Sequence, residues 1–77
     1  MIIPKDKEIL DMQVRLFRIA CHRWNKSIKE CAEIFEKYDV DNYIKSAYGF
    51  FHVQGDKANF EEIMSYLDRK GAGITCS

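Results

Sequence analysis

His52 is the side chain in this sequence with the best claim to chemistry, because histidine titrates near neutral pH and this one lies between Phe51 and Val53 beside a glycine. A catalytic or metal-binding histidine needs a second group at a suitable spacing. No second histidine, carboxylate or cysteine stands at such a spacing from it. We therefore interpret His52, Gln54 and Gly55 as a structural turn held by a hydrogen bond.

A zinc site is the second kind of chemistry to consider, because cysteine and histidine bind zinc. Its ligands would be Cys21, His22, Cys31 and His52. Zinc motifs usually contain two ligands separated by two residues, and this set contains no such pair. Adjacent helical positions also point about 100° apart. The cysteines, an odd number with Cys76, indicate reduced thiols. We expect neither a metal nor another cofactor.

The sequence also lacks the features of an enzyme, since it pairs no nucleophile with a base and contains no convergent carboxylates. A chain of 77 residues forms one small domain, and at this size only about 60% of the unfolded surface can be buried, which leaves little room for a deep pocket. We predict a single non-catalytic helical domain over residues 1–71, followed by a mobile tail over residues 72–77.

Hydrophobic periodicity predicts an all-α fold, a small bundle of four helices with one long, two short and one of medium length. The long helix runs from Asp6 to about Trp24, and Ser27 with Glu30 forms a capping box that starts the second helix. The stripe of the long helix that we expect to face the core consists of Leu10, Val14, Phe17, Cys21 and Trp24. The corresponding stripe of the second helix consists of Ile28, Cys31, Ala32, Phe35 and Tyr38.

The third helix is predicted to follow Asp41 as its N-cap and to end near Gly49. Residues 50–53 are predicted to form an extended aromatic and histidine turn between the third and fourth helices. The fourth helix is expected to begin at Asn59, or a turn earlier at Asp56, and to end at Gly71. Its predicted core residues are Phe60, Ile63, Met64 and Leu67.

A second apolar row on the long helix is our candidate interface. Met12, Leu16 and Ile19 recur at i, i+4 and i+7 beside the expected core stripe, so their outer edge should be exposed. Arg15 and Arg18 would supply a polar rim for contact with another protein or a second copy. In the alternative interpretation this row is part of the core, with Leu16 covered by the last helix.

Charge gives a second functional hypothesis, a nucleic-acid-binding domain of helix-turn-helix type. Seven basic residues against three acidic ones precede residue 30, although the formal net charge is zero. The candidate recognition helix, from Asp41 to Tyr48, offers only Lys45 as a base. We therefore do not expect nucleic-acid binding. The chain shows no signal-peptide pattern and no membrane-spanning apolar run, so we expect a cytoplasmic protein without membrane contact.

The order of the segments along the chain is similar to that of a known family. An amphipathic first helix is followed by residues 33–40 (EIFEKYDV), which lead into residues 41–44, then by residues 51–55 (FHVQG), then by an acidic helix that ends in Arg69, Lys70 and Gly71. In this order the chain resembles a family of short, uncharacterised bacterial proteins of clostridial type, labelled only as a domain of unknown function. The resemblance implies a stand-alone helical domain. Because some members are encoded near ADP-ribosyltransferase-like proteins, it also implies a regulatory or antitoxin-like role.

Overall fold

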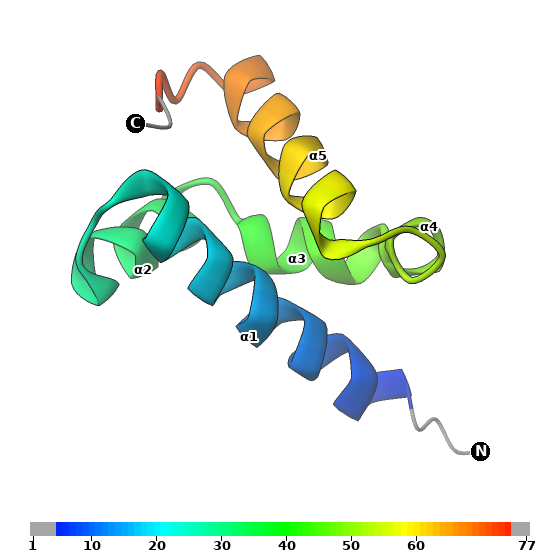
Figure 1. The fold of residues 1–77 in the computed structure, drawn as a ribbon. Coiled ribbons are helices and arrows are strands. Elements are labelled where there is room, and N and C mark those ends of the chain that lie inside the picture. Colours follow the sequence, from blue (N-terminus) through cyan, green and yellow to red (C-terminus); the bar gives the residue numbers. More distant parts are fainter. Residues whose placement is uncertain (1–4, 75–77) are drawn as a thin grey trace.

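A computed structural model describes residues 5–74, and within this range the chain forms five helices and no strand (Figure 1). The helices are α1 (Lys5–Trp24), α2 (Ile28–Lys37), α3 (Val40–Ser46), α4 (Tyr48–Phe51) and α5 (Asp56–Arg69). The predicted all-α class is confirmed, and α1, α2, α3 and α5 are the four predicted helices. Helix α1 contacts each of the other three, so it is the centre of the bundle.

The buried face of α1 is not the predicted one. Its four buried residues, Met12, Leu16, Ala20 and Trp24, follow one another at intervals of four, whereas Leu10 and Val14 of the predicted stripe are exposed. Helix α1 carries two adjacent apolar stripes, and α3 and α5 pack against it on the side of Leu16. The predicted stripe is wrong for Leu10 and Val14 but right for Trp24, and Phe17 and Cys21 are half-buried against the core. Periodicity identifies apolar faces but not the neighbour that covers each of them.

The remaining helices contribute most of the core residues that their sequences predict. The buried side chains are Cys31 and Phe35 from α2, Val40 and Ile44 from α3, Phe51 from α4, and Phe60, Ile63 and Leu67 from α5. Trp24 joins α1 to α5, because its Nε1 donates to Met64 Sδ at 3.1 Å. Ile28 and Ala32 of α2 were predicted to be core residues and are exposed, so α2 presents a narrower buried face than its sequence indicates.

Local hydrogen bonds define the helix ends. The predicted capping box of α2 is confirmed, with Glu30 N donating to Ser27 Oγ at 3.1 Å and Ser27 N donating to Glu30 Oε1 at 2.9 Å. Gly71, in the left-handed region with φ of 78°, ends α5 as predicted. Asp39 is also left-handed, with φ of 55°, and α3 starts directly after it at Val40. The predicted N-cap at Asp41 is therefore wrong by two residues.

The predicted extended segment is instead helical in its first half. Phe51 N donates to Ala47 O at 2.8 Å and His52 N donates to Tyr48 O at 2.9 Å, which closes the single turn of α4. Gly49, expected to end α3, lies inside this turn. The helical turn directs Phe51 into the core with no exposed surface, so the prediction that this segment anchors an aromatic ring holds although its backbone conformation differs.

A buried amide, Asn59, holds the turn between α4 and α5. Its Nδ2 donates to Phe51 O at 3.0 Å, and Gln54 Nε2 donates to its Oδ1 at 2.8 Å. Gly55 occupies the N-cap position, so α5 begins at Asp56, the earlier of the two predicted starts. The side chain of His52 is exposed and stacks on Tyr48 at 5.3 Å. The hydrogen bonds expected of His52 in this turn are thus supplied by Gln54 and Asn59.

The end of the described chain is packed against the bundle. Ala72 and Ile74 contact the core cluster, and Ala72 N donates to Leu67 O at 3.0 Å. The other residues of the predicted tail, 75–77, lie outside the described residues, as does Cys76.

Replacement of Asn59 by alanine should lower the free energy of unfolding by about 2 kcal/mol, because it removes two side-chain hydrogen bonds of the turn. The carbonyl of Phe51 keeps only the longer bond from Gln54 N, at 3.3 Å. Gln54→Ala, which leaves the bond from Asn59 Nδ2 to Phe51 O intact, should cost about 1 kcal/mol or less. Urea denaturation followed by circular dichroism measures both. Equal losses for the two variants would show that Asn59 is not the group on which the turn depends.

Candidate functional site

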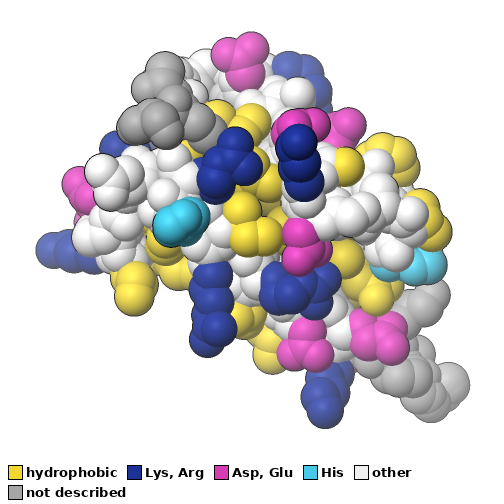
Figure 2. All heavy atoms as spheres, in the orientation of Figure 1, with side chains coloured by type: hydrophobic (Ala, Val, Ile, Leu, Met, Phe, Trp, Pro, Cys, Tyr) yellow, Lys and Arg dark blue, Asp and Glu magenta, His cyan; other side chains and the backbone are white. Residues whose placement is uncertain are grey.

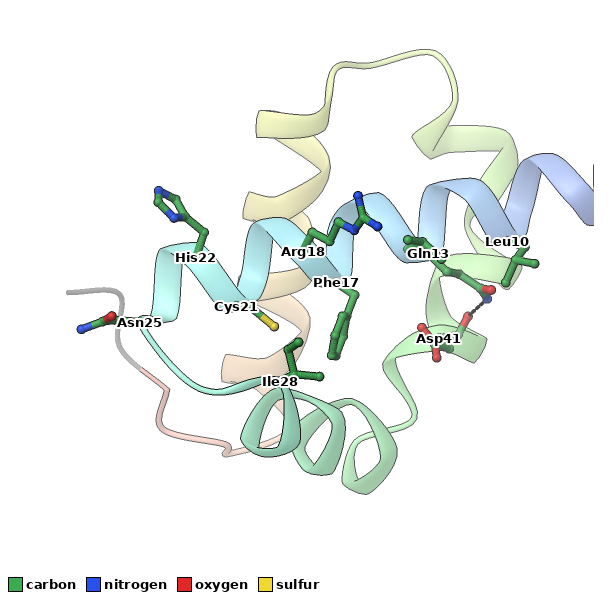
Figure 3. Close-up of a pocket in the computed structure, with 10 residues that line it drawn as sticks. Leu10, Gln13, Phe17, Arg18, Cys21, His22, Asn25, Ile28 and Asp41 are labelled. Carbon is green, nitrogen blue, oxygen red and sulfur yellow. Dashed lines mark hydrogen bonds between the residues drawn. The ribbon is translucent and has the colours of Figure 1, made fainter.

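An apolar groove runs beside α1 where this helix meets the first turns of α2 and α3. It encloses about 600 Å³, and Figure 3 shows its walls, with α1 on one side and Ile28 and Asp41 on the other. The residues that line it are Leu10, Gln13, Val14, Phe17, Arg18, Cys21, His22, Asn25, Ile28 and Asp41. Most of the apolar ones belong to the α1 stripe that was predicted to be core.

The groove is apolar because α2 and α3 cover this second stripe of α1 only in part. The side chains of Leu10, Val14 and Ile28 are 57%, 42% and 72% exposed. Phe17 and Cys21 are half-buried between them, and the ring of Phe17 packs edge-on against Phe35 at 5.1 Å. Single exposed apolar residues are common, but a contiguous set in a hollow is typical of a binding surface.

The polar residues differ between the two ends of the groove. At one end Gln13 Nε2 donates to the backbone oxygen of Asp41 at 2.8 Å. Burial, and then the neighbouring charge of Asp39, raises the pKa of the Asp41 carboxyl above its ordinary value. Further along α1 the groove is lined by Arg18, with His22 a turn beyond. Figure 2 shows basic side chains next to exposed apolar ones along the line that α1 takes in Figure 1.

The candidate interface predicted from the sequence does not lie on the surface as a unit. Met12 and Leu16 are buried and belong to the core, because α3 and α5 cover this side of α1. The alternative interpretation, in which this row is core, is the correct one for these two residues. Ile19 is half-buried against the core, and Arg15 Nε lies 3.2 Å from Asp56 Oδ2 in an ion pair with α5. Arg18 is the one predicted interface residue that lines the groove.

Sequence reasoning could have identified the groove from Ala20. The spacing of Met12, Leu16, Ala20 and Trp24 predicts a buried stripe only when Ala20 is counted as a contact residue, and the small side chain makes it easy to overlook. Ala20 has no exposed surface. With that stripe assigned to the core, Leu10 and Val14 are left to face solvent.

The two described thiols differ in chemistry. Cys21 lines the groove, whereas Cys31 is fully buried beneath it. Burial, helped by a hydrogen bond that the Cys31 thiol donates to the sulfur of Cys21, raises the pKa of Cys31 to about 12, so its thiol stays protonated at neutral pH. Within residues 5–74 no cluster of three or more His, Cys, Asp or Glu side chains could hold a metal ion. The imagined zinc ligands are therefore not brought together in this part of the chain.

The turn residues His52, Gln54 and Gly55 do not form a site with the groove, and none of them lines it. Among the described helices, none is long and apolar enough to span a membrane.

These features define a class: a small all-α domain with an apolar groove along its central helix. Residues 11–70, which extend from α1 to the end of α5, match the model of a family described as "Protein of unknown function (DUF3791)". The chain belongs to this family, which confirms the predicted resemblance to a domain of unknown function. No curated protein and no solved structure matches the chain.

The two stripes of α1 should respond differently to truncation. Leu16→Ala should lower the free energy of unfolding by about 2–5 kcal/mol, because it opens a cavity in the core. Val14→Ala, on the exposed stripe of the same helix, should change it by less than about 0.5 kcal/mol. Chemical denaturation measures both variants. A larger loss for Val14→Ala would mean that the exposed stripe is the one that holds the bundle together.

Thiol labelling should separate Cys21 from Cys31. In a Cys76→Ser background, an alkylating reagent at pH 8 should modify Cys21 and leave Cys31 unmodified, because the Cys31 pKa of about 12 keeps almost none of it as thiolate. Raising the pH toward 10 should increase the Cys31 rate about tenfold per pH unit, as its thiolate fraction grows. Peptide mass spectrometry identifies each adduct. Equal rates at pH 8 would contradict the assigned burial.

Proposed function

We propose that this protein is an interaction module that binds another polypeptide chain through the groove beside α1 and has no catalytic activity of its own. The observation that carries the proposal is the contiguous exposure of Leu10, Val14 and Ile28 around the half-buried Phe17 and Cys21. Arg18, His22 and Asp41 give this surface the polar rim that protein interfaces usually have.

The apolar side chains of the groove can supply part of the free energy of reversible binding. Complete burial of a Val, Leu or Ile side chain is worth roughly 1.5–3 kcal/mol, so covering three half-exposed ones supplies on the order of 3 kcal/mol. Micromolar affinity requires about 8 kcal/mol. The apolar rim residues thus provide a substantial share, and polar contacts around Arg18 and Asp41 would have to supply the rest.

A regulatory role in the cytoplasm, antitoxin-like in the sense of restraining a partner protein, is the finer form of this proposal. Two observations support it. The groove is lined by exposed apolar side chains, which suit it to holding part of a partner protein. Cys21 and Cys31 are free thiols, which are typical of a reducing compartment.

Nucleic-acid binding is less well supported by α3, the candidate recognition helix. It spans only Val40–Ser46, with Val40 and Ile44 buried and acidic residues Asp39 and Asp41 at its start. Phosphates would meet negative charge at this end, and Lys45 is the helix's one basic residue.

Photo-crosslinking in the cells that make this protein tests the proposal. A photoreactive residue in place of Val14 should give adducts of defined mass, since this side chain lies on the groove. The same residue in place of Val53, which is 72% exposed but does not line the groove, is the matched control. The absence of adducts from position 14, or equal adducts from both positions, would refute binding through the groove.

A further inference from the structure

The deeper question is what occupies the groove. We propose that its occupant is a second copy of this chain, whose α1 packs antiparallel to the first across a twofold axis. The inference rests on the proposed function and specifies its partner.

The exposed stripe has the spacing of a helix-pairing seam. Leu10, Val14, Phe17 and Cys21 follow one another at intervals of four, three and four residues, the a and d pattern of two packed helices. The intervals read the same in both directions. An antiparallel copy can therefore place Leu10 opposite Cys21 and Val14 opposite Phe17, which sets a larger side chain against a smaller one in each layer. A twofold interface requires self-complementarity of this kind.

The same register places opposite charges together. With Leu10 opposite Cys21, the residue opposite Arg18 is Gln13 of the other copy, and Gln13 is hydrogen-bonded to the backbone of Asp41 at 2.8 Å. Arg18 of each copy then faces Asp41 of the other, and the symmetry makes this contact twice. Figure 3 shows Arg18 and Gln13 on successive turns of α1, with Asp41 on the opposite wall of the groove.

Neither Arg18 nor Asp41 forms an ion pair within residues 5–74 of one copy. In the described part of the chain the single ion pair is between Arg15 and Asp56 on the other side of α1. Arg18 is exposed. The pKa of the Asp41 carboxyl is raised by burial and then by the like charge of Asp39. The guanidinium of Arg18 from a second copy would stabilise the Asp41 carboxylate, which in the monomer lies beside a like charge.

The direction of α1 gives the antiparallel arrangement a further advantage over a parallel one. The first half of α1 carries a net charge of −1, from three acidic residues and two lysines, and the second half carries +3, from three arginines and no acidic residue. The residues of the first half are Lys5, Asp6, Lys7, Glu8 and Asp11, and those of the second are Arg15, Arg18 and Arg23. Antiparallel packing opposes unlike halves and unlike ends of the helix dipoles, whereas parallel packing would oppose like ones.

Sedimentation equilibrium of the full chain tests the assignment. The wild type should sediment as a monomer–dimer equilibrium. Arg18→Asp alone and Asp41→Arg alone should each raise the dimer dissociation constant at least tenfold, because each places two like charges across the interface. The double variant, which restores opposite charges, should return to within about threefold of the wild type. Lys57→Asp, which reverses an exposed charge on α5, is the control and should have no effect; circular dichroism verifies that all variants fold.

Either of two results would overturn the inference: a wild type that stays monomeric at every concentration, or a dimer that neither reversal weakens. Position 14 crosslinks then separate this failure from that of the proposed function. Adducts with a second copy support the inference, and adducts with a different protein overturn it but leave the groove as a binding site. No adducts at position 14 would remove both.

Discussion

The burial of one stripe of α1, formed by Met12, Leu16, Ala20 and Trp24, is the constraint on which the rest of this structure depends. Helix α1 contacts α2, α3 and α5, so each of these takes its position from this stripe. Ala20 has no exposed surface, and Trp24, at the end of the helix, contacts Phe35, Phe60 and Met64. A chain this small can cover only part of its apolar surface, and α1 has more apolar surface than three short helices can bury.

The groove follows directly from this limit. Once the Leu16 side of α1 is covered, the stripe that contains Leu10 and Val14 faces solvent beside the start of α2. Ile28, in the first turn of α2, is also exposed, because the side of α2 that faces the core is occupied by Cys31. The core stripe and the groove thus lie on different faces of one helix, so substitutions can alter them separately.

Short connections fix the other helices around α1. Asn25 and Asp39, both left-handed with φ of 55°, turn the chain sharply after α1 and α2. Such turns tolerate asparagine and aspartate better than other non-glycine residues. The turn at Asp39 also places Asp41 at the end of the groove, where the Asp41 carboxyl lies near the negative charge of Asp39. The connection from α4 to α5 depends on Asn59, a fully buried amide in an otherwise apolar core.

The sequence by itself determined which segments are helical and how several of them begin and end. The capping box of Ser27 and Glu30, the α5 stripe around Ile63 and the terminal Gly71 are all encoded within a few neighbouring residues, so local chemistry was enough to predict them. Only the tertiary structure decided which stripe of α1 is buried, because two apolar stripes lie side by side and the choice belongs to the helices that cover them. It also decided the one-turn helix α4, since a turn this short is marginal alone and is stabilised by burial of Phe51 and by the amide of Asn59, eight residues further along.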